Sequence, residues 1–253
     1  MNNYLRNPPR VITDILKVAS EVIKEQGICS IKMAVIAARA ECSKKTLYNH
    51  FKCKEDIVVA LFIMHFNDMA DKINDIINSD TLSNQEKIIY SMSYDPVKCL
   101  AANQNDLCIN FLGVNPHIYE QASPEFIGNL TIIFMEVKEQ TEKLWQHVIT
   151  EGEVLSSKEE VLKCIVSLNQ VERGAVAMGQ NKFVRQFGHD FDFRPTFDLL
   201  CNLLYSLEWK HKCPSLSYDN MLKTISPVVS KKTKLDLRHY ALKMESLKES
   251  IDL

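Results

Sequence analysis

Glycine and proline are scarce in this sequence, at 7 and 8 of 253 residues. An all-β fold needs many tight turns, and these two residue types supply most of them. Their scarcity therefore argues against such a fold and favours long helices. The sequence also lacks any apolar run of about 18 residues, the length that a membrane-spanning helix needs. We therefore expect no membrane partner.

The first ten residues, MNNYLRNPPR, lack the apolar core of a secretory signal. The eight cysteines form no CxxC pair and have no regular spacing. Together these absences indicate a cytoplasmic protein whose cysteines are reduced and mostly buried. A redox-sensing thiol remains an alternative.

The motifs of the common enzyme classes are absent too. The sequence contains no GxGxxG, Walker loop, GxSxG or HExxH pattern. His147 and Glu151 are one helical turn apart and could bind a metal, but two ligands without a third make a weak site. We therefore expect neither an enzyme nor a cofactor or metal.

Charge is divided unevenly along the chain. Residues 1–57 contain ten Lys or Arg and six Asp or Glu, a net charge of +4, whereas the remainder carries −6. A basic end on an acidic body is expected where only one end meets a polyanion.

Apolar residues recur at helical spacing along the whole chain, and no long stretch alternates with the period of a strand. The sequence thus predicts an all-α protein. The predicted helices cover about 10–26, 30–40, 44–51, 54–78, 84–93, 124–150, 157–180 and 195–210, with an irregular or short helical piece at 96–112.

The segment MAVIAARAECSKKTLYNHFKCKEDI, residues 33–57, contains a very short helix between two others. Such a helix is not stable alone, so its neighbours must hold it. Two helices joined by a three-residue turn form a helix-turn-helix, whose second helix enters the DNA major groove. Helical spacing places Leu47 and Phe51 on its inner face.

The outer face is rich in hydrogen-bonding groups. Lysines can donate to guanine, and Asn49 suits adenine. Tyr48, Thr46 and His50 suit the sugar-phosphate backbone, and Lys54 adds a cation beside the start of the next helix. The predicted DNA-binding residues are Lys32, Lys44, Lys45, Thr46, Tyr48, Asn49, His50 and Lys54.

The segment from Ile36 to Ile57 resembles the DNA-binding domain of the TetR family of bacterial regulators. The matching residues are Ile36, Ala37, Ala40, Ser43, Thr46, Leu47, Tyr48, His50, Phe51, Lys54 and Ile57, preceded by Gly27 and Ile28. The resemblance implies a transcriptional regulator, usually a repressor. It also implies a larger helical domain that forms a homodimer and binds a small-molecule effector.

Two residues depart from the family pattern. Glu41 occupies the turn position where the family often has glycine, which implies strain unless the turn stays right-handed. Ile31 and Lys32 stand where the family commonly has Ser or Thr to contact phosphate. Lys32 can still reach phosphate as a point charge.

We divide the chain into a helix-turn-helix domain at 1–57, a helical ligand-binding and dimerisation domain at 58–213, and a C-terminal helical extension at 214–253. The larger domain shows no cluster of buried-looking charges, which favours an apolar ligand. The predicted pocket residues are Phe66, Phe111, Phe134 and Trp145. The predicted dimer residues are Gly174, Met178, Leu200, Leu203, Leu204 and Leu207, although the leucines could equally fill a monomer core.

One further alternative keeps the DNA-binding domain and gives the helical body a protein partner instead of a ligand. The C-terminal extension motivates it, because that segment could bind another protein. Its basic residues could also add DNA contacts; they are Lys231, Lys232, Lys234 and Arg238.

Overall fold

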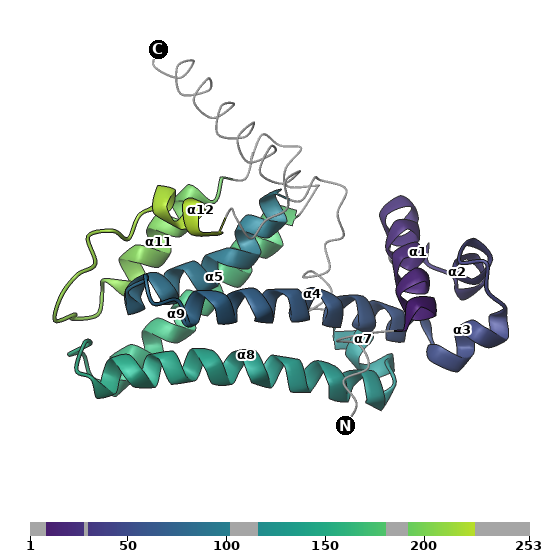
Figure 1. Cartoon of the computed structure of the whole chain (residues 1–253), viewed down its shortest axis with the longest axis horizontal. Helices are drawn as coiled ribbons and strands as arrows, with labels where there is room; N and C mark the ends of the chain where they lie inside the picture. The colour runs from purple at the N-terminus through teal and green to yellow at the C-terminus, as the bar shows by residue number, and fades with distance from the viewer. Residues whose placement is uncertain (1–8, 28–29, 102–115, 181–191, 226–253) are drawn as a thin grey trace, which may run out of the picture. The chain divides into compact units, whose positions relative to one another are not determined.

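The computed structural model describes residues 9–27, 30–101, 116–180 and 192–225. These residues form helices and contain no strand, so the predicted all-α class is confirmed (Figure 1). Contacts divide the chain into two compact units. The first unit contains residues 1–71 and 105–139, and the second contains 72–104 and 140–253.

The first unit contains the three helices of the predicted helix-turn-helix domain, the first part of α4, the short helix α7, and the first part of α8. Their bounds are α1 Arg10–Gln26, α2 Met33–Arg39, α3 Lys44–His50, α4 Lys54–Ile77, α7 Pro116–Gln121 and α8 Pro124–Thr150. The boundary that we placed after Ile57 therefore does not coincide with an edge of this compact unit.

Helix α1 packs on α2 and buries one apolar face. Ile12 and Leu16 are buried, whereas Val11 is 38% exposed. Gly27 ends the helix as expected: its backbone N–H donates to the Ile23 carbonyl at 2.9 Å, and its φ of 77° suits glycine.

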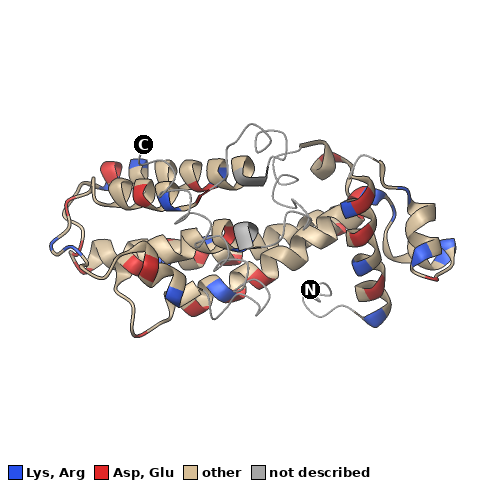
Figure 2. Cartoon of the chain, turned by 90° about the horizontal axis from the view of Figure 1, so that it is seen from above, with Lys and Arg blue, Asp and Glu red and all other residues tan. Residues whose placement is uncertain are grey.

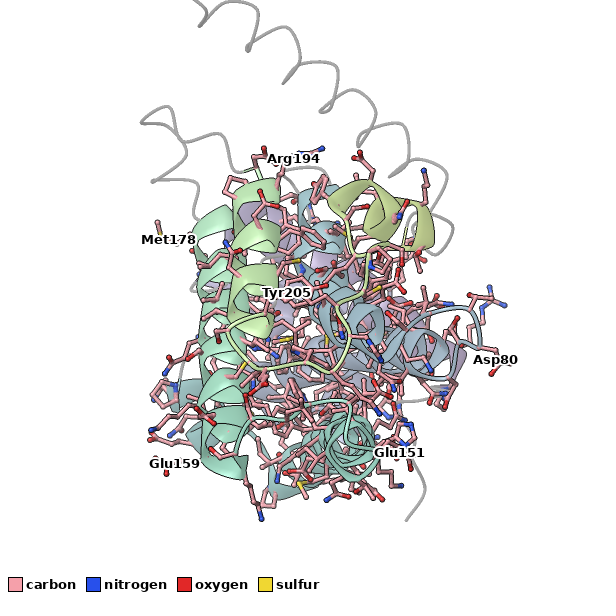
Figure 3. The ribbon with its side chains drawn as sticks, turned by 90° about the vertical axis from the view of Figure 1, so that its left-hand side faces the viewer. Asp80, Glu151, Glu159, Met178, Arg194 and Tyr205 are labelled. Carbon is pink, nitrogen blue, oxygen red and sulfur yellow. The ribbon has the colours of Figure 1, made fainter. Side chains whose placement is uncertain are left out.

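The second unit is built on α9, which packs against both α5 and α11. Figure 3 views this unit from one end and shows α9 and α11 side by side. Glu159 lies at one end of the pair, and Met178 and Arg194 lie near the other. The bounds are α5 Asn84–Ala101, α9 Lys158–Gln180, α11 Arg194–Leu204 and α12 Tyr218–Ile225.

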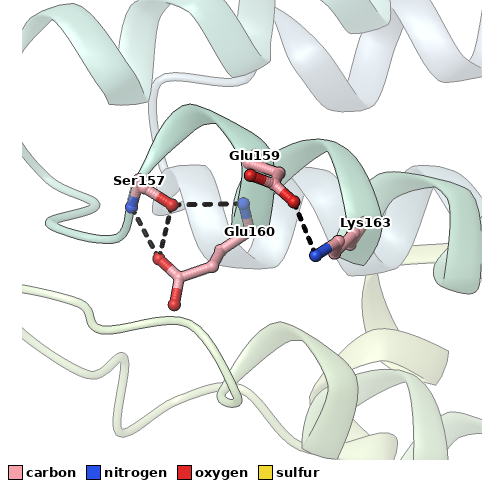
Figure 4. Close-up of polar contacts among 4 residues, drawn as sticks. All are labelled: Ser157, Glu159, Glu160 and Lys163. Atoms are coloured by element: carbon pink, nitrogen blue, oxygen red, sulfur yellow. Dashed lines mark hydrogen bonds and ion pairs between the residues drawn. The ribbon is translucent and has the colours of Figure 1, made fainter.

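Two helices of this unit begin with a capping box, in which a serine and a glutamate three residues later satisfy each other's backbone N–H groups. At α9, the Glu160 carboxylate accepts the Ser157 backbone N–H at 2.8 Å, and the Ser157 hydroxyl accepts the Glu160 N–H at 3.4 Å (Figure 4). Ser83 and Glu86 repeat the arrangement before α5. The boxes fix where both helices start.

The largest errors in the predicted helix ends are in α5 and α11. Helix α5 continues through Pro96 to Ala101 instead of stopping near Ser93. Proline removes one backbone hydrogen bond, but Val97 is buried and packing keeps the segment helical. Helix α11 ends at Leu204 instead of near Lys210, because the following residues pair with the loop after α8. Val154 and Trp209 form an antiparallel bridge there.

Part of the predicted C-terminal extension belongs to the second unit. The Ser215 hydroxyl donates to the Glu86 carboxylate at 2.7 Å. The Arg194 guanidinium lies 4.3 Å from the centre of the Tyr218 ring, and its Nη2 lies 3.3 Å from the Asp219 carboxylate. These contacts hold α12 against α11. The basic residues predicted as extra DNA contacts, from Lys231 to Arg238, lie outside the described residues.

Candidate nucleic-acid interface

The buried residues of α2 and α3 fix how the short helix α3 is held. Ile36 and Ala37 of α2 and Leu47 of α3 are at most 3% exposed, and α2 contacts both α1 and α3. Leu47 and Phe51 both lie inside, which confirms the predicted inner face. The opposite side of α3 is therefore turned outward.

Ser43 fixes the start of α3. Its side chain accepts the Thr46 backbone N–H at 3.0 Å, and the two hydroxyl oxygens lie 2.8 Å apart. Phe51 ends the helix, and its backbone N–H donates to the Leu47 carbonyl at 2.9 Å. Both ends of the seven-residue helix are thus defined.

The turn between α2 and α3 has a left-handed residue. Glu41 has a φ of 50°, a conformation that costs a non-glycine residue about 1 kcal/mol. The strain expected from the missing glycine is therefore present. The Cys42 backbone N–H donates to the Ala37 carbonyl at 3.1 Å, which closes the turn.

The predicted DNA-contacting residues of α3 divide into two groups. Lys44, Lys45, Tyr48 and Asn49 are exposed, whereas Thr46 and His50 are half-buried. Tyr48 is 45% exposed, an unusual fraction for a large aromatic side chain. Figure 2 shows basic residues on α3. This surface can donate hydrogen bonds to base edges and neutralise phosphate charge.

Two further predicted lysines flank the helices. Lys32 is exposed at the N-cap of α2, and its carbonyl accepts the Val35 N–H at 3.0 Å. Lys54 begins α4, with its Nζ 4.0 Å from the Glu55 carboxylate. Lys54 can exchange that long, partly exposed pairing for a phosphate group.

Lys52 was missed in the sequence analysis. It is exposed just after α3, and its Nζ donates to the Tyr48 carbonyl at 3.2 Å. A cation at the C-terminus of a helix is favourable for that helix. The same ammonium group lies beside Tyr48, so it belongs with the candidate interface. Its position two residues before Lys54 was the signal available in the sequence.

The four predicted pocket residues are distributed over both units. Phe66 is buried in the first unit, and its ring centre lies 6.2 Å from that of Phe134, which is 50% exposed. Trp145 is buried in the second unit. Phe111 lies outside the described residues. Phe62, which we did not predict, packs edge-on against Phe66 at 4.7 Å.

Some of the predicted dimer residues are buried in the second unit, and others are exposed. Leu200, Leu204 and Leu207 are at most 4% exposed and fill the core of the second unit, which corrects that part of the predicted interface. Leu203 is half-buried, and Gly174 and Met178 are exposed. The exposed large apolar side chains of α9 and α11 are Leu162, Val166, Met178 and Leu199, at 46 to 55%.

The possible metal pair gains no third ligand within the described part of the chain. His147 and Glu151 are joined by a backbone hydrogen bond of 2.9 Å. No group of three His, Cys, Asp or Glu side chains there is arranged to hold a metal ion. Among the same residues, no helix has the length and apolar character to cross a membrane.

Residues 15–61 match the family model described as bacterial regulatory proteins, tetR family. This match confirms the resemblance seen in the sequence and includes α2, α3 and the start of α4. A comparison with curated protein sequences finds no match.

Several solved structures share the fold of this chain. The FadR regulator of Bacillus subtilis, in complex with stearoyl-CoA, is 20% identical, with a TM-score of 0.55 over 76% of this chain and 95% of that one. A TetR regulator from Legionella pneumophila is 19% identical, with a TM-score of 0.53 over 80% and 100% of the two chains. The SmeT–triclosan complex is 14% identical, with a TM-score of 0.52 over 83% and 98%. The chain therefore has the fold of TetR-family transcriptional regulators.

Proposed function

We propose that the protein is a dimeric repressor that binds an operator in double-stranded DNA and is released from it by a small, largely apolar ligand. The observation that carries the proposal is the exposed face of α3. It presents Lys44, Lys45, Tyr48 and Asn49 from a helix whose opposite side is buried.

Dimerisation is supported by the apolar surface of α9 and α11. Leu162, Val166 and Met178 of α9 are each more than half exposed, and Leu199 of α11 is 46% exposed. Met178 projects away from the ribbon in Figure 3. Two such helix pairs can associate as a four-helix interface. A dimer also places two recognition helices on one operator, which gives the specificity that a single seven-residue helix lacks.

An apolar ligand is supported by the aromatic cluster of Phe62, Phe66 and Phe134, formed by α4 and α8. Two proteins of the same fold were solved with ligands that have a large apolar part: stearoyl-CoA, through its acyl chain, and triclosan. A ligand that binds more tightly to the conformation with lower DNA affinity increases the population of that conformation. The size of the shift is set by the difference between the ligand's affinities for the two conformations.

The first experiment selects binding sites from fragments of the source genome with the purified full-length protein. We expect a defined fragment to be preferred and its affinity to fall steeply with salt, because lysines displace counterions from phosphates. The absence of any preference at low ionic strength would overturn the proposal.

The second experiment adds stearoyl-CoA and triclosan, separately, to the complex with the selected fragment. Release of DNA together with a higher melting temperature of the free protein supports the ligand-controlled repressor. Specific DNA binding that neither these compounds nor a wider set of apolar metabolites alters would favour the alternative, in which the body binds a protein partner.

The proposed dimer surface is tested with Val166→Asp and Met178→Asp. Each variant places a charge on the apolar face and is expected to yield monomers in sedimentation experiments. Lys223→Asp, which introduces the same side chain at an exposed site on α12, is the matched control. An unchanged dimer in both Asp variants, or a wild-type monomer, contradicts this surface.

A further inference from the structure

The carboxylate of Asp56 connects two parts of the first unit that are far apart in sequence. Asp56 lies in the first turn of α4 and is completely buried. One oxygen, Oδ1, accepts the Ser123 backbone N–H at 2.7 Å. The other, Oδ2, accepts the Ser123 hydroxyl at 2.9 Å and the Lys52 backbone N–H at 2.7 Å.

Each partner stands at a helix end. Lys52 follows Phe51, the C-cap residue of α3, and Ser123 immediately precedes α8. One buried charge therefore satisfies backbone N–H groups at the end of the recognition helix and at the start of α8. Hydrogen bonds to an ionised group are stronger than those between neutral groups. A buried carboxylate that loses its donors is strongly destabilised.

Two other contacts lie at the same place. The rings of Phe51 and Phe126 are stacked with their centres 5.6 Å apart, and both side chains are buried. The Cys53 thiol lies 3.5 Å from the Gln121 carbonyl oxygen. Residues 51–56 thus contact residues 121–126 through an apolar stack and a set of polar bonds. We call this arrangement the Asp56–Ser123 joint.

The two kinds of contact respond differently to movement. Stacked rings tolerate some sliding, whereas hydrogen bonds weaken steeply once their distance or angle departs from a narrow range. A displacement of the start of α8 would therefore break bonds at Asp56 before it separated the rings. A joint that breaks in this way would have two arrangements, bonded and broken, as a switching element requires.

We propose that Asp56 and Ser123 are positioning residues, which set the orientation of the recognition helix from the start of α8. A movement of α8 then changes DNA affinity without any ligand contact to α3. This inference rests on the proposed function, because it assigns the regulation of the same DNA-binding surface. It does not require the identity of the ligand.

The test uses the full-length chain with Ser123→Ala, which removes the hydroxyl donor and keeps the backbone N–H. Asp56→Asn, of similar shape, is a second variant that removes the charge. Ser157→Ala is the matched control, because it removes a serine that caps another helix, α9, in the second unit. All measurements are made at a temperature where each variant is fully folded.

The first readout is amide hydrogen exchange of residues 44–50 without DNA. We expect about tenfold faster exchange there in Ser123→Ala, from the loss of one charge-assisted hydrogen bond, and no change in Ser157→Ala. A joint that only stabilised the unit would accelerate exchange evenly across α1, α2 and α3. Such an even effect, or no effect, would overturn the inference.

The second readout is the ratio of affinities for the selected DNA fragment and a scrambled one. We expect this ratio to fall about tenfold in Ser123→Ala, because α3 is no longer held in register with the bases. An unchanged ratio would overturn the inference while leaving the proposed function intact. If the wild-type protein prefers no fragment, the proposed function fails, and the exchange data alone decide whether the joint positions α3.

Discussion

The hydroxyl oxygen of Ser43 accepts the Thr46 backbone N–H at 3.0 Å and lies 2.8 Å from the Thr46 hydroxyl. This pair begins a helix of seven residues, too short to be stable without its cap and its neighbours. Ser43→Ala should therefore lower the free energy of unfolding by about 1 kcal/mol in urea denaturation. Ser43→Asn, which keeps a capping oxygen, should lose much less. Equal stability of Ser43→Ala and wild type would show that the cap contributes nothing.

Glu41 offers a way to stabilise the same domain. Its φ of 50° is unfavourable for any residue with a Cβ, and glycine removes that cost. We expect Glu41→Gly to raise the free energy of unfolding by up to about 1 kcal/mol, offset in part by the greater freedom of glycine in the unfolded chain. Glu41→Gln removes the charge and keeps the strain, so its stability should stay near wild type. A gain in both variants would assign the effect to charge.

Local signals in the sequence were sufficient for much of the fold. Ser43 and Gly27 mark helix ends by chemistry that depends only on near neighbours, and the structure has both ends where they were expected. The exposed face of α3 followed from helical spacing once Leu47 and Phe51 were assigned to the inside. Periodicity and capping operate over a few residues, so a sequence displays them directly.

Interactions between distant segments could not be predicted in that way. Asp56 and Ser123 are 67 residues apart, and neither residue type predicts the other. The same limit explains the error in the dimer surface. A leucine stripe on α11 has the same spacing whether it faces its own unit or another chain, and Leu200 and Leu204 face their own unit. Helix α11 ended early because residues 208–210 pair with a loop more than fifty residues earlier.

Lys54 and Asn49 should contribute to DNA binding in different ways. Lys54→Ala removes a phosphate contact, so affinity should fall for all sequences and the salt dependence should decrease by about one counterion. Asn49→Ala removes a candidate base contact and should change sequence preference instead. Fluorescence anisotropy with selected and random duplexes over a salt series measures both. Equal effects of the two variants on both duplexes would contradict these roles.

Three cysteines of the described chain should react slowly with alkylating reagents. Burial raises the pKa of Cys53 and Cys164 to about 11 and that of Cys201 to about 12. Only the thiolate reacts, and it is rare at neutral pH in such groups. Iodoacetamide treatment followed by mass spectrometry should therefore label these residues only after unfolding in guanidinium. Rapid labelling of any of them in the folded protein would revive the redox-sensor alternative.

Glu172 should make stability depend on pH near neutrality. It lies on α9, which packs against α5, and its side chain is 8% exposed. Burial raises the pKa of Glu172 to about 7. The Arg173 guanidinium, with Nε 3.2 Å from the carboxylate, opposes this increase, and the buried Asp95 of α5 adds to it.

The direction of the effect follows from proton binding. The unfolded chain releases this proton near pH 4.5 and the folded chain near pH 7, so the folded state binds more protons between those values. The contribution of this group to the free energy of unfolding is therefore fully present below about pH 4.5. It falls by about 3 kcal/mol as the pH rises through 7.

Glu172→Gln cannot ionise. It should equal wild type near pH 4 and be more stable near pH 8, by up to about the same amount. Urea denaturation over this range, with the exposed Glu159→Gln of the same helix as control, measures the difference. A difference between Glu172→Gln and wild type that does not vary with pH would mean that the carboxylate ionises normally in the folded protein.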